Sequence, residues 1–115
     1  MKVTIEELQS YLFACYGDDG DDQGFFMKLV EEIGELAEVL NKMYGRKLIG
    51  EDNVRTQLGN ELADVIHYTM AIAALNGLAM SDIIISKDKA ASIKYGHKIN
   101  LEQFILNMRN GEADQ

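Results

Sequence analysis

Proline is absent from this 115-residue chain, which also lacks tryptophan and has a single cysteine, Cys15. Because proline interrupts helices and the chain is rich in helix-forming residues, its absence favours an all-α fold. One cysteine excludes an internal disulfide bond and is typical of a reducing compartment such as the cytoplasm. The hydrophobic fraction of 47% is ordinary for a globular domain, so we expect one modest core.

Basic residues are also scarce, since 11 lysines and arginines stand against 19 aspartates and glutamates, for a net charge of −8. This excess of negative charge argues against a nucleic-acid polymer as partner, but it allows small polyphosphates that arrive with a bound cation. The sequence shows neither an apolar run long enough to span a bilayer nor a basic-then-apolar signal peptide. We therefore expect a cytoplasmic protein with no membrane partner.

Several familiar catalytic and binding patterns are missing as well. The chain has no Gly-rich phosphate loop of the Walker type and no convincing Ser/His/Asp or Cys/His triad. The acidic stretch from Gly17 to Gly24 lacks the twelve-residue register and terminal glutamate of an EF-hand, so it is expected to be a loop.

Periodic apolar positions predict four main helices and a short fifth one. Thr4 and Glu7 have capping-box spacing at the start of the first helix, which Gly17 ends. The other expected helices span residues 25–44, 53–76, 82–95 and 100–109, with Ser81 as the N-cap of the fourth. We predict a four-helix-bundle-like fold with a short additional C-terminal helix, in one domain over residues 1–110 with a frayed tail at 111–115.

The third expected helix carries no formal charge from Val65 to Leu75. A helix that is apolar nearly all round is surrounded by protein, and the remaining helices of so short a chain can hardly cover it. We therefore expect a subunit interface, and hence a homo-oligomer, to complete its burial.

Two acidic helical turns, Glu31 to Glu35 and Glu61 to Asp64, carry the strongest chemical signal. On a helical wheel Glu32, Glu61 and Asp64 fall within the apolar sector, and Glu35 lies at its edge. Each like-charged pair at about 4 Å would cost roughly 4 kcal/mol at an effective dielectric of about 20. Such a cluster must be protonated, paired with cations or bound to a metal, and oxygen-only ligands suit Mg²⁺ or Mn²⁺. The metal ligands that we predict are Glu32, Glu35, Glu61 and Asp64.

Acidic pairs on two helices, together with lysines on a later helix, indicate metal-assisted phosphoryl chemistry. A carboxylate outside the inner shell, such as Glu31 or Glu38, could orient or deprotonate the attacking water. Together with Glu35, which is also a predicted metal ligand, these two are the candidate catalytic residues. The alternative for these three is a solvated helix face. Lys28, one turn before Glu32, is a candidate substrate contact or an internal counter-ion.

The stretch from Glu31 to Glu38, followed by Glu61-Leu62-Ala63-Asp64-Val65, resembles the ExxE and ExxD double motif of the MazG family. That family belongs to the all-α nucleoside triphosphate pyrophosphohydrolases, with the dCTP and dimeric dUTP pyrophosphatases as relatives. The resemblance covers the chain from the second helix to about Gly96. It implies Mg²⁺-dependent cleavage of a nucleoside triphosphate between the α and β phosphates, and assembly as a homodimer or homotetramer.

The resemblance also implies substrate contacts. Tyr68, one turn after Asp64, would lie near the phosphates or the sugar. Lys87, Lys94 and Tyr95 match a later family pattern in type, but Ala91 stands where the family often has asparagine, which bears on base or sugar specificity.

Aromatic residues leave two readings open. Phe25 and Phe26 could stack on a base or, as the simpler reading, pack in the core. Asp64 and His67 have the carboxylate-x-x-His spacing of di-iron bundles, but no histidine follows Glu32 or Glu35 in that way, which favours a hydrogen-bonded packing role for His67.

A different class of function also stays open. The chain could be a catalytically silent acidic helical protein that senses nucleotides or binds a partner. The intact set of four acids favours the enzyme.

Overall fold

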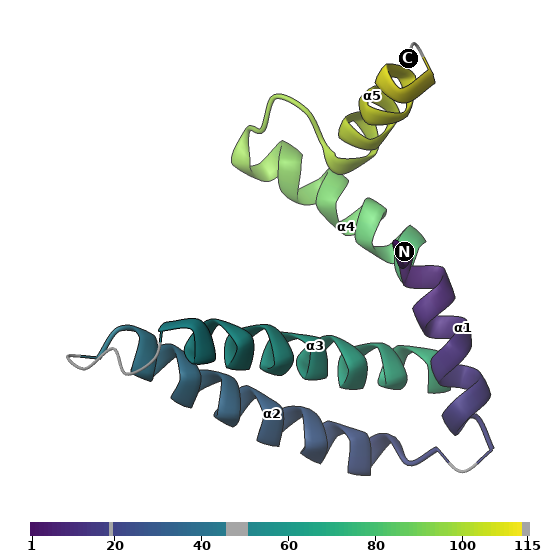
Figure 1. Cartoon of the computed structure of the whole chain (residues 1–115). Coiled ribbons are helices and arrows are strands. Elements are labelled where there is room, and N and C mark those ends of the chain that lie inside the picture. Colours follow the sequence, from purple (N-terminus) through teal and green to yellow (C-terminus); the bar gives the residue numbers. More distant parts are fainter. Residues whose placement is uncertain (19, 46–50, 114–115) are drawn as a thin grey trace. The chain divides into compact units, whose positions relative to one another are not determined.

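The computed structural model, which describes residues 1–18, 20–45 and 51–113, confirms the all-α fold (Figure 1). Within these ranges there is no strand, and the five helices are α1 (Ile5–Tyr16), α2 (Asp22–Met43), α3 (Glu51–Leu75), α4 (Met80–Tyr95) and α5 (Leu101–Ala113). The chain divides into two compact units, Met1–Gly77 with α1 to α3 and Leu78–Gln115 with α4 and α5. Each unit is described by itself.

Local sequence signals set several helix ends. The Thr4 hydroxyl accepts a hydrogen bond from the Glu7 amide at 3.1 Å, and the Glu7 carboxylate accepts one from the Thr4 amide at 2.8 Å, which confirms the capping box. At the end of α4, Gly96 has a φ of 67°, a left-handed conformation that glycine adopts without strain. Asn100 and Gln103 exchange two bonds of 2.9 Å at the start of α5.

Other helix ends differ from the sequence prediction. Helix α2 begins at Asp22, so Asp22 to Gly24 are helical although they were expected in the loop. An aspartate in the first turn is favourable beside the positive end of the helix dipole. The Asp22 carboxylate also accepts a hydrogen bond from the Asn76 side chain at 3.0 Å, which links the start of α2 to the residue after α3.

The second half of the chain holds further differences. Helix α4 begins at Met80, with Ala79 at the cap position and no side-chain cap bond, so the prediction of Ser81 as N-cap is wrong. Helix α5 continues to Ala113, so it ends four residues after the predicted end at Arg109. Helix α3 begins at Glu51, two residues before the predicted start.

Helices α2 and α3 form an antiparallel hairpin, and α1 lies across the C-terminal end of α3 (Figure 1). Gly20, in the link between α1 and α2, packs so tightly that a Cβ atom there would collide with the Leu75 side chain. Only glycine allows this close approach. Most of the buried apolar side chains come from the C-terminal half of α3: Met70, Ala71, Ala73 and Ala74. The others are Leu12 on α1, Val39 on α2 and Val54 near the start of α3.

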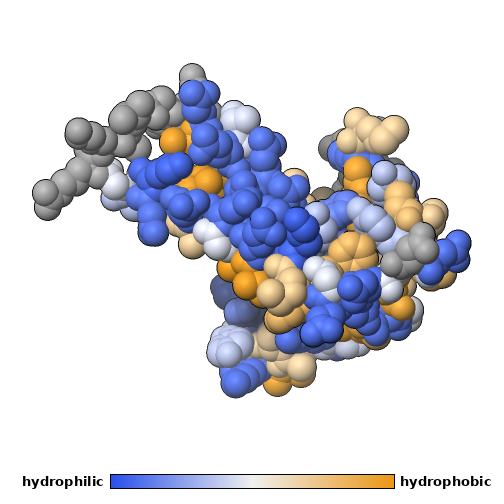
Figure 2. Space-filling model, turned by 90° about the horizontal axis from the view of Figure 1, so that it is seen from below, coloured by the Kyte–Doolittle hydropathy of each residue, from blue (hydrophilic) through white to orange (hydrophobic). Residues whose placement is uncertain are grey.

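A considerable apolar surface remains open to solvent, as Figure 2 shows by orange side chains among blue ones. On α2 and α3 it includes Phe26, Met27, Val30, Ile33, Leu62 and Ile66, which are 44–61% exposed. The surface around Gly34, in the middle of α2, is open as well, since a Cβ atom there would meet no atom within 4 Å.

The second unit consists of α4, α5 and the corner between them. The Asp88 carboxylate accepts bonds from the Leu101 amide at 2.7 Å and the Ser92 hydroxyl at 3.4 Å, which fixes α5 on α4. Lys89 and Glu102 form an ion pair of 3.3 Å across the same corner. In the described part of the chain no single helix is long and apolar enough to cross a membrane. The bent pair of α3 and α4 meets the criteria of length and composition for a membrane span, and only those.

Candidate functional site

Three acidic side chains of the α2–α3 hairpin meet between the two helices. One carboxylate oxygen from each of Glu32, Glu61 and Asp64 lies within 4.8 Å of the others, and we refer to these residues as the carboxylate cluster. Glu61 and Asp64 are three residues apart on α3, so both project to the same side, toward Glu32 on α2. Three of the four predicted metal ligands are thus brought together.

Two oxygens of the carboxylate cluster are enclosed without a partner. The Oε2 atoms of Glu32 and Glu61 are shielded from solvent, and no described residue outside the neighbouring carboxyl groups donates a hydrogen bond to them. The ion pairs found in the described ranges, Lys28–Glu31 and Lys89–Glu102, do not involve the carboxylate cluster. Burying a carboxylate oxygen without a partner is unfavourable, so this arrangement needs a proton or a cation. An oxygen-only ligand set with two orphaned oxygens fits a hard divalent cation.

The carboxyl groups of Glu32 and Glu61 bind protons more tightly than an ordinary glutamate does. Burial raises the pKa of Glu32 to about 7, and the nearby carboxyl groups of Glu61 and Glu35 and the charge of Asp64 add to this effect. The pKa of Glu61 is also raised, chiefly by burial. Near neutral pH a proton therefore competes with a cation for the same oxygens.

Glu35 lies beside the carboxylate cluster but outside the set of three. Its side chain is half-buried, and its carboxyl group contributes to the raised pKa values of both Glu32 and Glu61. This agrees with its predicted place at the edge of the apolar sector. From there Glu35 could complete a coordination shell or accept a proton from a bound water.

The outer face of α2 carries the other candidate acids. Glu31 pairs with Lys28 at 3.5 Å, and both side chains are 55% exposed. Glu38 is exposed as well. In the cluster itself, Glu32 and Glu61 are half-buried and Asp64 is exposed. The ion pair makes Lys28 the counter-ion of Glu31 rather than of the carboxylate cluster, and a solvated helix face stays open as the role of Glu31 and Glu38.

Four aromatic rings gather where the end of α1 meets α2 and α3, and two of them, His67 and Tyr68, follow Asp64 by one helical turn. We call Tyr16, Phe25, His67 and Tyr68 the aromatic quartet. Ring centroids are 4.8 Å apart for Tyr16–Phe25, 6.1 Å for Phe25–Tyr68, 5.0 Å for His67–Tyr68 and 5.8 Å for Tyr16–His67. The Tyr16 hydroxyl is hydrogen-bonded to His67 Nε2 at 3.0 Å, so His67 is the hydrogen-bonded packing residue that we expected.

Phe25 packs against Tyr16 and Tyr68 and is half-buried, which favours its role as a core residue. Phe26 is exposed. Sequence reasoning missed Tyr16. Nothing in its own neighbourhood distinguishes it from the other apolar positions of α1.

The remaining predicted contacts lie on α4 in the second unit. Lys87, Lys94 and Tyr95 are exposed, and the Lys94 ammonium is 5.4 Å from the centre of the Tyr95 ring. Ala91, at the position of the family asparagine, is half-buried. Their roles toward a substrate stay predictions.

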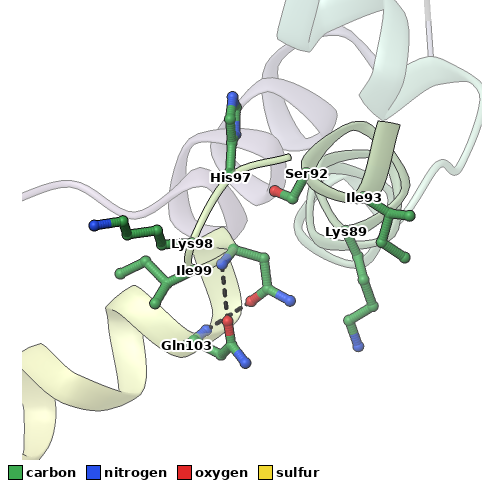
Figure 3. Close-up of a pocket in the computed structure, with 8 residues that line it drawn as sticks. Lys89, Ser92, Ile93, His97, Lys98, Ile99 and Gln103 are labelled. Atoms are coloured by element: carbon green, nitrogen blue, oxygen red, sulfur yellow. Dashed lines mark hydrogen bonds between the residues drawn. The ribbon is translucent and has the colours of Figure 1, made fainter. Parts of the chain in front are cut away.

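A pocket of about 360 Å³ lies at the corner between α4 and α5 (Figure 3). Its basic side chains do not converge, since Lys89 is paired with Glu102 and Figure 3 shows His97 and Lys98 pointing in different directions. None of the predicted site residues lines it. We therefore do not count it as part of the site.

Comparison with known proteins gives two findings. Residues 23–91, more than half of the chain, match the family model described as the MazG nucleotide pyrophosphohydrolase domain. The structure is similar to the crystal structure of iMazG from Vibrio DAT 722, with a TM-score of 0.63, 26% sequence identity, and coverage of 81% of this chain and 98% of that chain. Curated proteins gave no match.

Proposed function

This chain belongs to the MazG nucleotide pyrophosphohydrolase family, and from that premise we propose that it hydrolyses a nucleoside triphosphate between the α and β phosphates. The products would be a nucleoside monophosphate and pyrophosphate, and the reaction would depend on Mg²⁺, with Mn²⁺ as a substitute. The observation that carries this proposal is the carboxylate cluster with its two enclosed, unpartnered oxygens.

Glu32, Glu61 and Asp64 would hold the metal ion, with Glu35 as a fourth ligand. A bound divalent ion would supply charge neutralisation at the phosphates and a more acidic water. Among the candidate catalytic residues, Glu35 is the best placed to accept the proton of that water because it lies beside the carboxylate cluster. Glu31 is exposed and paired with Lys28, and Glu38 is exposed, so both are weaker candidates.

The substrate contacts that we propose are Lys28 and the residues implied by the family resemblance, namely Tyr68, Lys87, Lys94 and Tyr95. Tyr68 follows Asp64 by one helical turn, so its ring and hydroxyl could face the phosphates or the sugar. Lys87 and Lys94 could neutralise charge on the leaving pyrophosphate, with Tyr95 close to Lys94. Lys28 could join them only by exchanging its partner Glu31 for a phosphate.

We propose further that the chain is a homodimer or homotetramer. Support comes from the exposed large apolar side chains of α2 and α3, because apolar side chains gathered on one surface mark interaction sites. The molar mass in solution, measured by light scattering, tests this directly.

Pyrophosphate release from a panel of ribo- and deoxynucleoside triphosphates, with and without Mg²⁺, tests the reaction. Wild type would be compared with Glu61→Gln, which removes one charge from the carboxylate cluster, and with Glu6→Gln, a matched control on α1. We expect Mg²⁺-dependent release that only Glu61→Gln abolishes. Mg²⁺ binding without turnover of any nucleotide would instead favour the catalytically silent, nucleotide-sensing alternative.

A further inference from the structure

Tyr16 and His67 connect α1 to the helix that carries two of the cluster acids. Tyr16 is the last residue of α1, and His67 lies on α3 three residues after Asp64. Their polar atoms meet at 3.0 Å in a part-buried position. This bond therefore fixes the end of α1 next to the turn of α3 that follows the carboxylate cluster.

Within the aromatic quartet, Tyr68 packs against the His67 ring, whose position the bond to Tyr16 fixes. The His67 ring meets the Tyr68 ring edge-on, with an interplanar angle of 77°, and Phe25 lies between Tyr68 and Tyr16. Each ring thus contacts two others, and three helices contribute to the quartet. A hydrogen bond is directional, so the bond to Tyr16 sets the plane of the His67 imidazole against which Tyr68 packs.

Tyr68 itself is available to a ligand. It lies four residues after Asp64, on the face of α3 that bears the carboxylate cluster. Its hydroxyl has no hydrogen-bond partner among the residues that the structure describes.

Packing alone would not call for a polar pair at this place. Two phenylalanine rings would occupy a similar space without partly burying a hydroxyl and an imidazole. Replacing both partners of a hydrogen bond by apolar groups of similar shape can be close to neutral for stability. We infer that Tyr16 and His67 are positioning residues, which hold Tyr68 in the orientation that contacts the nucleotide. The inference rests on the proposed function, in which Tyr68 is a substrate contact.

The test compares Tyr16→Phe, His67→Phe and the double variant with wild type. Each single change leaves one polar partner unsatisfied and should lower the melting temperature, whereas the double change should restore most of it. In the double variant we expect the KM for the triphosphate to rise about threefold to tenfold, the range that the loss of one hydrogen bond produces. Its kcat and its Mn²⁺ affinity should stay near wild type.

Two further variants sharpen the result. Tyr11→Phe removes an exposed hydroxyl from the same helix and should leave KM unchanged. His67→Gln keeps a hydrogen-bonding group and should raise KM less than His67→Phe does, which tests the inference even if the double variant does not fold.

Two kinds of result would overturn the inference: one concerns the KM of the variants and the other the activity of the wild-type protein. A wild-type KM in the double variant, or equal KM values for His67→Gln and His67→Phe, would show a purely structural pair while leaving the proposed function intact. Absence of turnover by the wild-type protein would overturn the proposed function and this inference together.

Discussion

Helix α2 presents glutamates on two faces, and the two faces have opposite properties. On the outer face, Glu31 is open to solvent and paired with Lys28 at 3.5 Å. On the inner face, one oxygen of Glu32 is enclosed without a partner, and burial raises the pKa of this residue to about 7. The two residues are neighbours in the sequence and chemically identical. A rotation of about 100° around the helix therefore separates a solvated surface charge from a group suited to hold a metal.

The largest difference between the faces should appear in metal affinity. Glu32→Gln removes a ligand from the carboxylate cluster, and we expect it to weaken Mn²⁺ binding by about 100-fold or more, since even indirect partners of a ligand contribute 10- to 100-fold. Glu31→Gln, the matched change on the outer face, should leave Mn²⁺ affinity near wild type. Isothermal titration calorimetry measures both, and equal losses would remove the distinction between the faces.

Metal should also stabilise the fold through the inner face only. A ligand at about 100 times its Kd stabilises the folded state by about 2.7 kcal/mol, so saturating Mg²⁺ should raise the melting temperature clearly. The rise should be larger at pH 8 than at pH 6, because protons compete for the Glu32 carboxylate below its raised pKa. Thermal denaturation with Mg²⁺ or with EDTA checks this. A rise of equal size in Glu32→Gln would place the bound ion elsewhere.

Without metal, the inner face should make stability depend on pH. The pKa of Glu32 is about 7 in the folded protein and 4.5 as an ordinary glutamate, so between these values the folded state binds more protons than the unfolded state. This contribution to stability is complete below about pH 4.5 and is lost as the pH rises through about 7. Urea denaturation in EDTA should therefore show a wild-type stability that falls over this window relative to Glu32→Gln. Parallel curves for the two proteins would contradict the raised pKa.

The smallest effect should come from the outer face. Lys28→Met breaks the exposed pair with Glu31, and pairs of this kind contribute less than about 1 kcal/mol to the free energy of unfolding. Urea denaturation at low and high salt checks this, since added salt screens what little attraction there is. A larger loss of stability would mean that Lys28 also interacts with the carboxylate cluster.

Much of this molecule could be predicted from the sequence because the responsible interactions are local. The Thr4–Glu7 capping box and the Gly96 helix end depend on residues within one turn. The helical period likewise places Glu32, Glu61 and Asp64 on apolar faces before any packing is known. These features predicted the all-α fold and the acids that form the carboxylate cluster.

The contacts between helices, in contrast, were decided by the tertiary structure alone. Periodicity shows which face a side chain occupies, but not which residue of another helix it meets. The early start of α2 at Asp22 accompanies its bond to Asn76, which is distant in the sequence. The Tyr16–His67 bond and the close approach of Gly20 to Leu75 are of the same kind. The enclosure of two carboxylate oxygens belongs with them, because it exists only when α2 and α3 face each other.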